Sequence, residues 1–127
     1  LPRSTVMGLY VSHNCFHGTY RAFNRWRKAV AACAGVKLDE MEGFGGDITW
    51  PGPLAPDDPI LWLLAHDDDR GTIPAAACAA LAGRLEELAG KLTTLDEILD
   101  LNHAATALRF ARGLRAAVAA GEDVEFS

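Results

Sequence analysis

The sequence predicts an α+β fold in which three or four helices are accompanied by a small antiparallel sheet that includes both chain ends. Apolar residues recur at helical spacing over three long segments, as expected for helices that pack on one core. Short alternating segments near residue 10 and at residues 124–126 predict the strands. With 127 residues, 50% of them hydrophobic, the chain has the composition of a single globular domain.

The N-terminal third predicts a strand followed by a helix. Residues 1–6 carry no periodic pattern and are interpreted as a cloning remnant before a natural start at Met7, so that residues 7–127 form the domain. Residues 7–13 mix β-branched, aromatic and polar residues and predict a strand. From Thr19 to Gly35 the pattern is that of an amphipathic helix. Its apolar stripe comprises Tyr20, Phe23, Val30 and Cys33, and its basic stripe comprises Arg21, Arg25 and Lys28.

The middle of the chain predicts a long surface connection and a short buried helix. Residues 36–59 are rich in glycine and proline, and Ile48–Trp50 is their one strand-like triplet, a third candidate for the sheet. Asp58 and Pro59 begin a helix over residues 60–65 that is apolar on nearly all sides. A polar turn follows at residues 66–71.

The C-terminal half predicts two helices and a final strand. Thr72 and Pro74 begin a helix whose leucines face the core at positions 81, 85, 88 and 92. The capping box Thr94–Glu97 predicts that the last helix begins there and runs to Gly121. The residues expected to face inward from that helix are Leu95, Ile98, Leu101, Ala105, Leu108 and Leu114. Val124–Phe126 alternates and is expected to pair with the first strand.

Charge and composition exclude several classes of protein. A net charge of −5 argues against nonspecific nucleic-acid binding, which needs a broad positive face. The longest strongly apolar stretch is residues 60–65, far below the roughly 20 residues that cross a bilayer. Three widely spaced cysteines without a C-x-x-C pair predict free thiols and a cytoplasmic location. The segment from Arg21 to Lys28 nevertheless contains four positively charged residues and no negatively charged one, which suits a small anionic ligand.

The first candidate site is the polar cluster Ser12–Gly18 between the predicted strand and helix. A helix N-terminus at a strand end favours anions because its backbone N–H groups are unpaired. His13 and His17 would share a metal only in a helix, and Gly18 favours a turn. Cys15 and His17 could form a nucleophile and base, but residues two apart seldom face each other. The alternative is that Ser12 and Asn14 merely cap the helix.

The second candidate site is the acidic segment from His66 to Ile73. It superficially resembles a calcium loop, but Arg70 and Ala77 stand where that loop needs ligands. A magnesium or manganese site built from His66, Asp68 and Asp69 remains open. So does a solvated turn in which an aspartate caps the next helix.

The third candidate is the aromatic and arginine content of the first helix. Arginine binds phosphate through its forked donors and aromatic rings stack on bases. Tyr20, Phe23 and Val30 are assigned to the core, whereas Trp26 and Arg27 remain ambiguous. The common nucleotide-binding and hydrolase signatures are absent, which favours binding over catalysis.

Residues 7–27, M-G-L-Y-V-S-H-N-C-F-H-G-T-Y-R-A-F-N-R-W-R, resemble the opening of a family of small uncharacterised proteins of actinobacterial phages and prophages. That opening typically reads M-G-L-D-V-S-H-x-C-W-x-G-A-Y-x-x-F-x-R-W-R. The resemblance extends to Met41–Phe44, to the leucines before His66 and to residues 113–115 and 121–126. Family members carry H-S-D-C-D-G-E-I at positions 66–73, so Arg70 replaces an acidic residue here. The resemblance implies a phage accessory protein that acts on host components, including nucleotide signals of antiviral defence.

The leading hypothesis is that the protein sequesters a small anionic, nucleotide-like ligand. The predicted ligand-binding residues are His13, Asn14, Cys15, Phe16, His17, Tyr20, Arg21, Arg25, Trp26, Arg27, His66 and Asp68. One alternative is a metal-assisted phosphoester hydrolase that uses His66, Asp68 and Asp69 with His13. Another is an inhibitor of a host protein that binds through residues 43–56, anchored by Phe44 and Trp50. A homodimer would allow a pocket between subunits. The shared site requires the turn after the first strand and the acidic turn to meet in one cleft.

Overall fold

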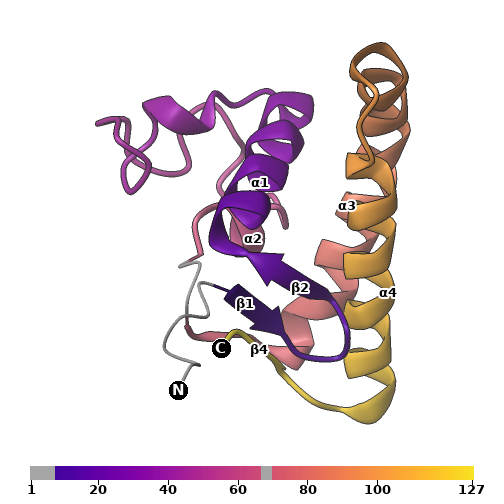
Figure 1. Cartoon of the computed structure of the whole chain (residues 1–127). Coiled ribbons are helices and arrows are strands. Elements are labelled where there is room, and N and C mark those ends of the chain that lie inside the picture. The colour runs from indigo at the N-terminus through magenta and orange to yellow at the C-terminus, as the bar shows by residue number, and fades with distance from the viewer. Residues whose placement is uncertain (1–7, 67–69) are drawn as a thin grey trace, which may run out of the picture.

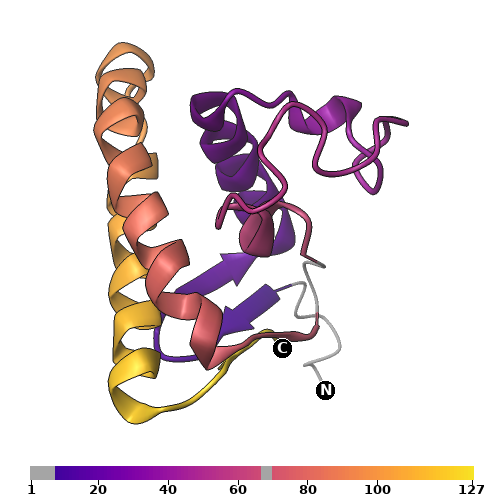
Figure 2. The same cartoon turned by 180° about the vertical axis from the view of Figure 1, so that it is seen from behind.

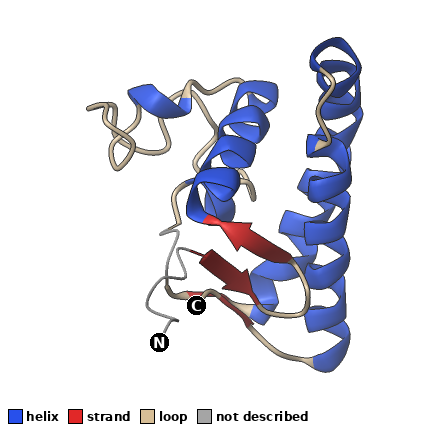
Figure 3. Cartoon of the chain, in the orientation of Figure 1, coloured by secondary structure: helices blue, strands red, loops and turns tan. Residues whose placement is uncertain are grey.

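The computed structural model describes residues 8–66 and 70–127 and confirms the α+β class. The elements in chain order are β1 (Gly8–Val11), β2 (Phe16–Thr19), α1 (Tyr20–Ala34), the 3-10 turn η2 (Leu38–Glu40), α2 (Leu61–Leu64), β3 (Thr72–Ile73), α3 (Ala75–Leu99), α4 (His103–Ala120) and β4 (Val124–Glu125). The antiparallel α3–α4 hairpin stands on one side of α1, and the long connection between α1 and α2 lies on the other side (Figures 1 and 2). The strands gather at one end of these helices (Figure 3).

The two ends of the described chain pair with each other, as the sequence predicts. β1 pairs antiparallel with β2, and β3 pairs antiparallel with β4. An antiparallel bridge between Val11 and Phe126 joins the two pairs, and Ser12 N donates to Glu125 O at 2.8 Å. Ile48 forms an isolated parallel bridge with Met41, so the triplet Ile48–Trp50 lies outside both sheets.

The expected turn between the first strand and the first helix is instead a β-hairpin. Its two central residues, His13 and Asn14, have φ values of 61° and 60°, as a type I′ turn requires. Arg109 of α4 fixes the turn by donating to the backbone oxygen of Asn14 at 3.1 Å and to its Oδ1 at 2.7 Å. Gly18, where a turn was expected, lies within β2. The hairpin therefore depends on contacts with α4.

Helix α1 begins and ends where its sequence signals indicate. Thr19 Oγ1 accepts the N–H of Ala22 at 3.0 Å, which caps the first turn. Gly35 ends the helix with a φ of 96°, in the left-handed region that glycine adopts without strain. Phe23 and Val30 are completely buried, which confirms their assignment to the core.

The predicted start of the last helix at Thr94 is wrong. Helix α3 continues through the capping box to Leu99, and α4 begins at His103. Asp96 still acts as a cap, but across the connection: its carboxylate accepts the N–H groups of His103 and Ala104 at 3.0 and 2.8 Å. A side chain from the end of one helix therefore caps the beginning of the next.

This boundary changes which residues face the core. Of the six residues expected to face inward, Leu114 is fully buried and Leu95 is partly buried against the core. The other four are exposed: Ile98, with 74% of its surface accessible, Leu101, Ala105 and Leu108. In α4 the buried positions are His103, Ala107, Phe110, Ala111, Gly113, Leu114 and Ala117.

The core joins α1 to the α3–α4 hairpin through aromatic rings. Trp26 stacks on Phe110 at 5.3 Å between ring centroids, and its indole Nε1 donates to His103 O at 3.2 Å. Phe16 packs edge-on against Phe23 at 5.0 Å. Trp26 and Phe16, which were predicted as ligand-binding residues, instead belong to the core.

Candidate functional site

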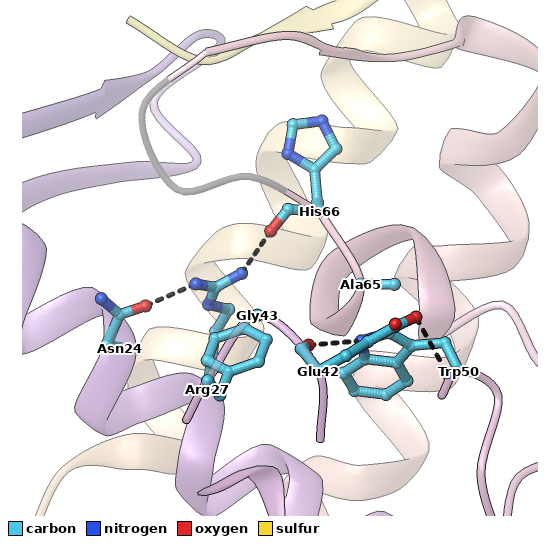
Figure 4. A pocket seen from close by; sticks show the side chains of 8 residues that line it. Asn24, Arg27, Glu42, Gly43, Trp50, Ala65 and His66 are labelled. Carbon is cyan, nitrogen blue, oxygen red and sulfur yellow. Dashed lines mark hydrogen bonds between the residues drawn. The ribbon is translucent and has the colours of Figure 1, made fainter. Parts of the chain in front are cut away.

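The candidate site is a cavity of about 460 Å³ between α1, the connection after η2 and the end of α2. Figure 4 shows it from close by. The lining residues are Asn24, Arg27, Glu42, Gly43, Phe44, Trp50, Ala65 and His66. Two of the predicted site residues, Arg27 and His66, are therefore brought together here.

Arg27 forms the inner wall of this cavity. Only 2% of its surface is exposed, and its guanidinium lies 4.8 Å from the ring centroids of both Phe23 and Phe44. Its Nη1 donates to Leu63 O at 3.3 Å and to His66 O at 2.7 Å, and its Nη2 donates to Asn24 Oδ1. These bonds and ring contacts compensate for the burial of the charge. Because the donors point at protein oxygens, Arg27 holds α1 against the end of α2.

The opposite wall is made by Glu42 and Trp50, which lie side by side in Figure 4. The Trp50 indole Nε1 donates to the backbone oxygen of Glu42 at 3.2 Å. Glu42 N donates to Ile48 O at 2.8 Å, which closes the chain between these residues into a compact loop. Phe44 packs edge-on against Trp50 at 6.3 Å. The Glu42 carboxylate is thereby placed at the cavity beside two aromatic faces.

The imidazole of His66 is held by β3 and by Phe126, the residue after β4. Its ring stacks on Phe126 at 4.2 Å between ring centroids, and its Nε2 donates a hydrogen bond to Thr72 O at 3.1 Å. Gly71, with a φ of 97°, leaves room for the ring, because a Cβ there would lie 3.2 Å from His66 Cε1. The ring points away from Arg27, and the backbone oxygen of His66 accepts from Arg27 (Figure 4).

His13 and its neighbours form a separate arrangement on α4. Ser12 Oγ donates to His13 Nδ1 at 2.8 Å, and His13 Nε2 donates to Glu122 Oε1 at 2.8 Å. Ser12 Oγ also accepts the N–H of Glu125 at 2.9 Å. These bonds fasten the β1–β2 turn to the end of α4. Among the described residues, none of this turn lines the cavity beside His66.

Cys15 is packed in the core and is a poor nucleophile. Burial, with a smaller contribution from Cys78, raises the pKa of the Cys15 thiol to about 12. The thiol therefore stays protonated at neutral pH, and the reactive species would be the thiolate. His17 is exposed, and its ring packs edge-on against Tyr10 at 6.2 Å between ring centroids. Because Cys15 is buried in the core and His17 lies on the surface, Cys15 and His17 do not form a catalytic pair.

The remaining predicted residues lie on the surface of α1 or outside the described chain. Arg21 and Arg25 are exposed, and Tyr20 is partly buried against the core. Asp68 and Asp69 fall outside the described residues. Within residues 8–66 and 70–127, no three His, Cys, Asp or Glu side chains are placed to hold a metal ion together.

Two polar cavity residues, Asn24 and Glu42, were not identified from sequence as site residues. Asn24 lies one helical turn before Arg27, and Glu42 falls in the segment Met41–Phe44 that extends the family resemblance. The helical spacing from Arg27 could have indicated Asn24, and the family resemblance at Met41–Phe44 could have indicated Glu42.

Comparisons with family models, curated proteins and solved structures give no match to this chain. In the part of the chain that the structure describes, no helix has the length and apolarity needed to cross a bilayer.

Proposed function

We propose that the protein binds a small nucleotide-like ligand in this cavity, with the base inside and the phosphate at the mouth. The supporting observation is that one cavity combines aromatic faces, a carboxylate and an amide. Its volume of about 460 Å³ falls within the roughly 300–1,000 Å³ typical of small-molecule sites. The ligand class is the one predicted from sequence, but the residues that contact it differ.

The inner part of the cavity suits a planar base with N–H donors. The rings of Phe44 and Trp50 provide faces for stacking, and the Glu42 carboxylate, whose Oε1 accepts the N–H of Trp50 at 3.4 Å, offers only acceptors. A carboxylate pairs well with two adjacent N–H groups, as on the edge of guanine. We therefore expect a preference for guanine over adenine.

The phosphate would lie against the exposed face of α1. Arg21 precedes Asn24 by three positions and Lys28 follows it by four, so both are its neighbours on the helix surface. Lys28 pairs with Asp39 at 3.8 Å, and both side chains are largely exposed. Such surface pairs are weak and exchange readily for phosphate. Arg27, predicted as a phosphate ligand, is instead committed to carbonyl oxygens.

Binding without catalysis is the activity that these residues support. The resemblance to phage proteins gives it a biological setting, in which the protein would sequester a nucleotide signal of host defence. A homodimer is not needed for this proposal, because one chain supplies all the lining residues.

Isothermal calorimetry tests the proposal with GMP, AMP, cyclic dinucleotides and ADP-ribose. We expect saturable heat with guanine ligands and about a tenfold loss of affinity in Glu42→Gln, since a bond to a charged group contributes roughly 1.5–3 kcal/mol. Arg21→Ala should weaken binding. Arg25→Ala is the matched control and should not, because Arg25 is adjacent to Asn24 in sequence and therefore does not lie beside it on the helix surface. No heat with any of these nucleotides, or equal affinity in Glu42→Gln, would refute the proposal.

A further inference from the structure

A second surface feature lies around Trp62 on α2, away from the cavity. Trp62 is 44% exposed and lines two hollows. The first hollow, of about 310 Å³, is lined by Pro56, Asp57, Asp58, Leu61 and Trp62. The second, of about 400 Å³, is lined by Asp57, Pro59, Trp62, Pro74, Ala76, Ala77 and Ala80. We name these two hollows, with the Trp62 indole that lines both, the Trp62 surface.

The Trp62 surface carries one negative charge that the described residues do not neutralise. Asp57 is exposed, lines both hollows and forms no ion pair within the described part of the chain. Asp58 differs, because Arg84 Nε and Nη2 bind its two carboxylate oxygens at 3.1 Å each. Arg84 also approaches Glu87 at 3.6 Å, so its charge is already shared.

The geometry points to the Trp62 surface as a docking site for an arginine or lysine side chain of a partner protein. A cation over an indole face is attracted by the π electrons, and the Asp57 carboxylate adds an opposite charge beside it. The methylene groups of the cation can lie on the alanines of α3 and the flanking prolines. Charge complementarity thus selects the occupant, since a phosphate would be repelled by Asp57.

The surface is preformed, which lowers the entropic cost of binding. Asp58 Oδ1 accepts the N–H of Ile60 at 2.9 Å and also accepts from Arg84 of α3, so the segment that leads into α2 is fixed against α3. Pro59 and Pro74 restrict the backbone on both sides of Trp62. A rigid aromatic beside a charge is the usual anchor of a protein interface. None of these residues lines the proposed nucleotide cavity, so the two proposals fail independently.

Titration of the full chain with a tetra-arginine peptide, followed by NMR of the indole N–H resonances, tests the inference. We expect a saturable shift of the Trp62 resonance and little shift of the buried Trp26 resonance. Tetracitrulline keeps the shape of the arginine peptide without its charge and should give no comparable shift. Trp62→Ala should abolish binding, with circular dichroism confirming that the variant is folded.

The carboxylate is tested by Asp57→Asn, with Asp47→Asn as the matched change at an exposed aspartate that lines neither hollow. We expect affinity to fall about threefold in the first variant and to be unchanged in the second, because exposed ion pairs contribute up to about 1 kcal/mol, or about fivefold. Equal binding of tetracitrulline, equal binding by Asp57→Asn, or no shift at millimolar peptide would overturn the inference. A Trp62 shift that follows protein concentration alone would also overturn it, in favour of self-association.

Discussion

Replacing Gly113 with alanine tests the packing of the β1–β2 turn against α4. A Cβ at this position would lie 2.5 Å from Cys15 Sγ, 2.8 Å from His13 O and 3.0 Å from Cys15 Cα. Two of these three atoms belong to the backbone of the turn, which Arg109 and Glu122 hold in place. The alanine therefore cannot be accommodated by the rotation of a side chain alone.

Two opposing effects set the magnitude. Alanine in place of glycine within a helix gains about 1 kcal/mol of propensity. Overpacking a well-packed core costs roughly 1–3 kcal/mol, and the upper end applies here because backbone atoms must move. We expect a net loss of about 2 kcal/mol in the free energy of unfolding. For a domain of this size that corresponds to a decrease of about 8 °C in Tm.

Urea and thermal denaturation measure this effect directly. Gly83→Ala and Gly90→Ala on α3 are the matched controls, because a Cβ at either position meets nothing within 4 Å. Both should stabilise the protein by up to about 1 kcal/mol. If Gly113→Ala stabilised the protein as much as these controls, the close approach of the turn to α4 would be refuted.

Three further predictions concern other parts of the fold. Asp96→Ala removes the cap of α4 and should cost about 1–2 kcal/mol in urea denaturation, whereas Glu97→Ala, an exposed neighbour, should cost almost nothing. Burial raises the pKa of Cys15 from 9.0 to about 12, so the unfolding free energy should fall as the pH rises from 9 toward 12. The slope of that loss is up to about 1.4 kcal/mol per pH unit, and an equally steep decline in Cys15→Ala would contradict this origin. Arg27→Lys cannot reproduce the forked contacts with Leu63, His66 and Asn24, so it should lower the Tm and weaken nucleotide binding, whereas Arg25→Lys should change neither.

The elements that could be predicted are those whose signals lie within the element itself. Helix α1 has its cap at Thr19 and its terminating glycine at Gly35, so local sequence determines both ends. The alternation in Val124–Phe126 likewise predicts a strand where β4 forms, although β4 pairs with β3 and an isolated bridge at Phe126 joins it to β1. In both cases the local preference and the final packing agree.

The missed strand β2 shows where local signals fail. A type I′ turn is usually recognised by Asn-Gly, but here His13 and Asn14 adopt the left-handed conformation. The contact that holds Asn14 comes from Arg109, which is 95 positions away in the sequence. No pattern near the turn carries that information. The sequence therefore indicated a polar cluster but not the hairpin.

The misplaced boundary between α3 and α4 has a related cause. The capping box at Thr94–Glu97 has the residue types of a helix start, yet it lies within the last turns of α3. Its Asp96 caps a helix that begins seven positions later. The residue type was identified correctly, and the helix it serves depends on how the chain turns.

The same distinction between residue type and placement determines how the ligand would be oriented. The basic segment of α1 was interpreted as one anion-binding cluster, but the helix divides it between two surroundings. Arg27 is buried and its donors bind carbonyl and amide oxygens, whereas Arg21 and Arg25 remain exposed. Glu42 adds a negative charge to the cavity wall. Because the donors of Arg27 are engaged by protein oxygens and Glu42 is negative, the proposed orientation places the phosphate outside the cavity along α1 and a neutral base with N–H donors inside. This polarity requires that a free nucleobase retain measurable affinity and that inorganic phosphate alone have none for the cavity.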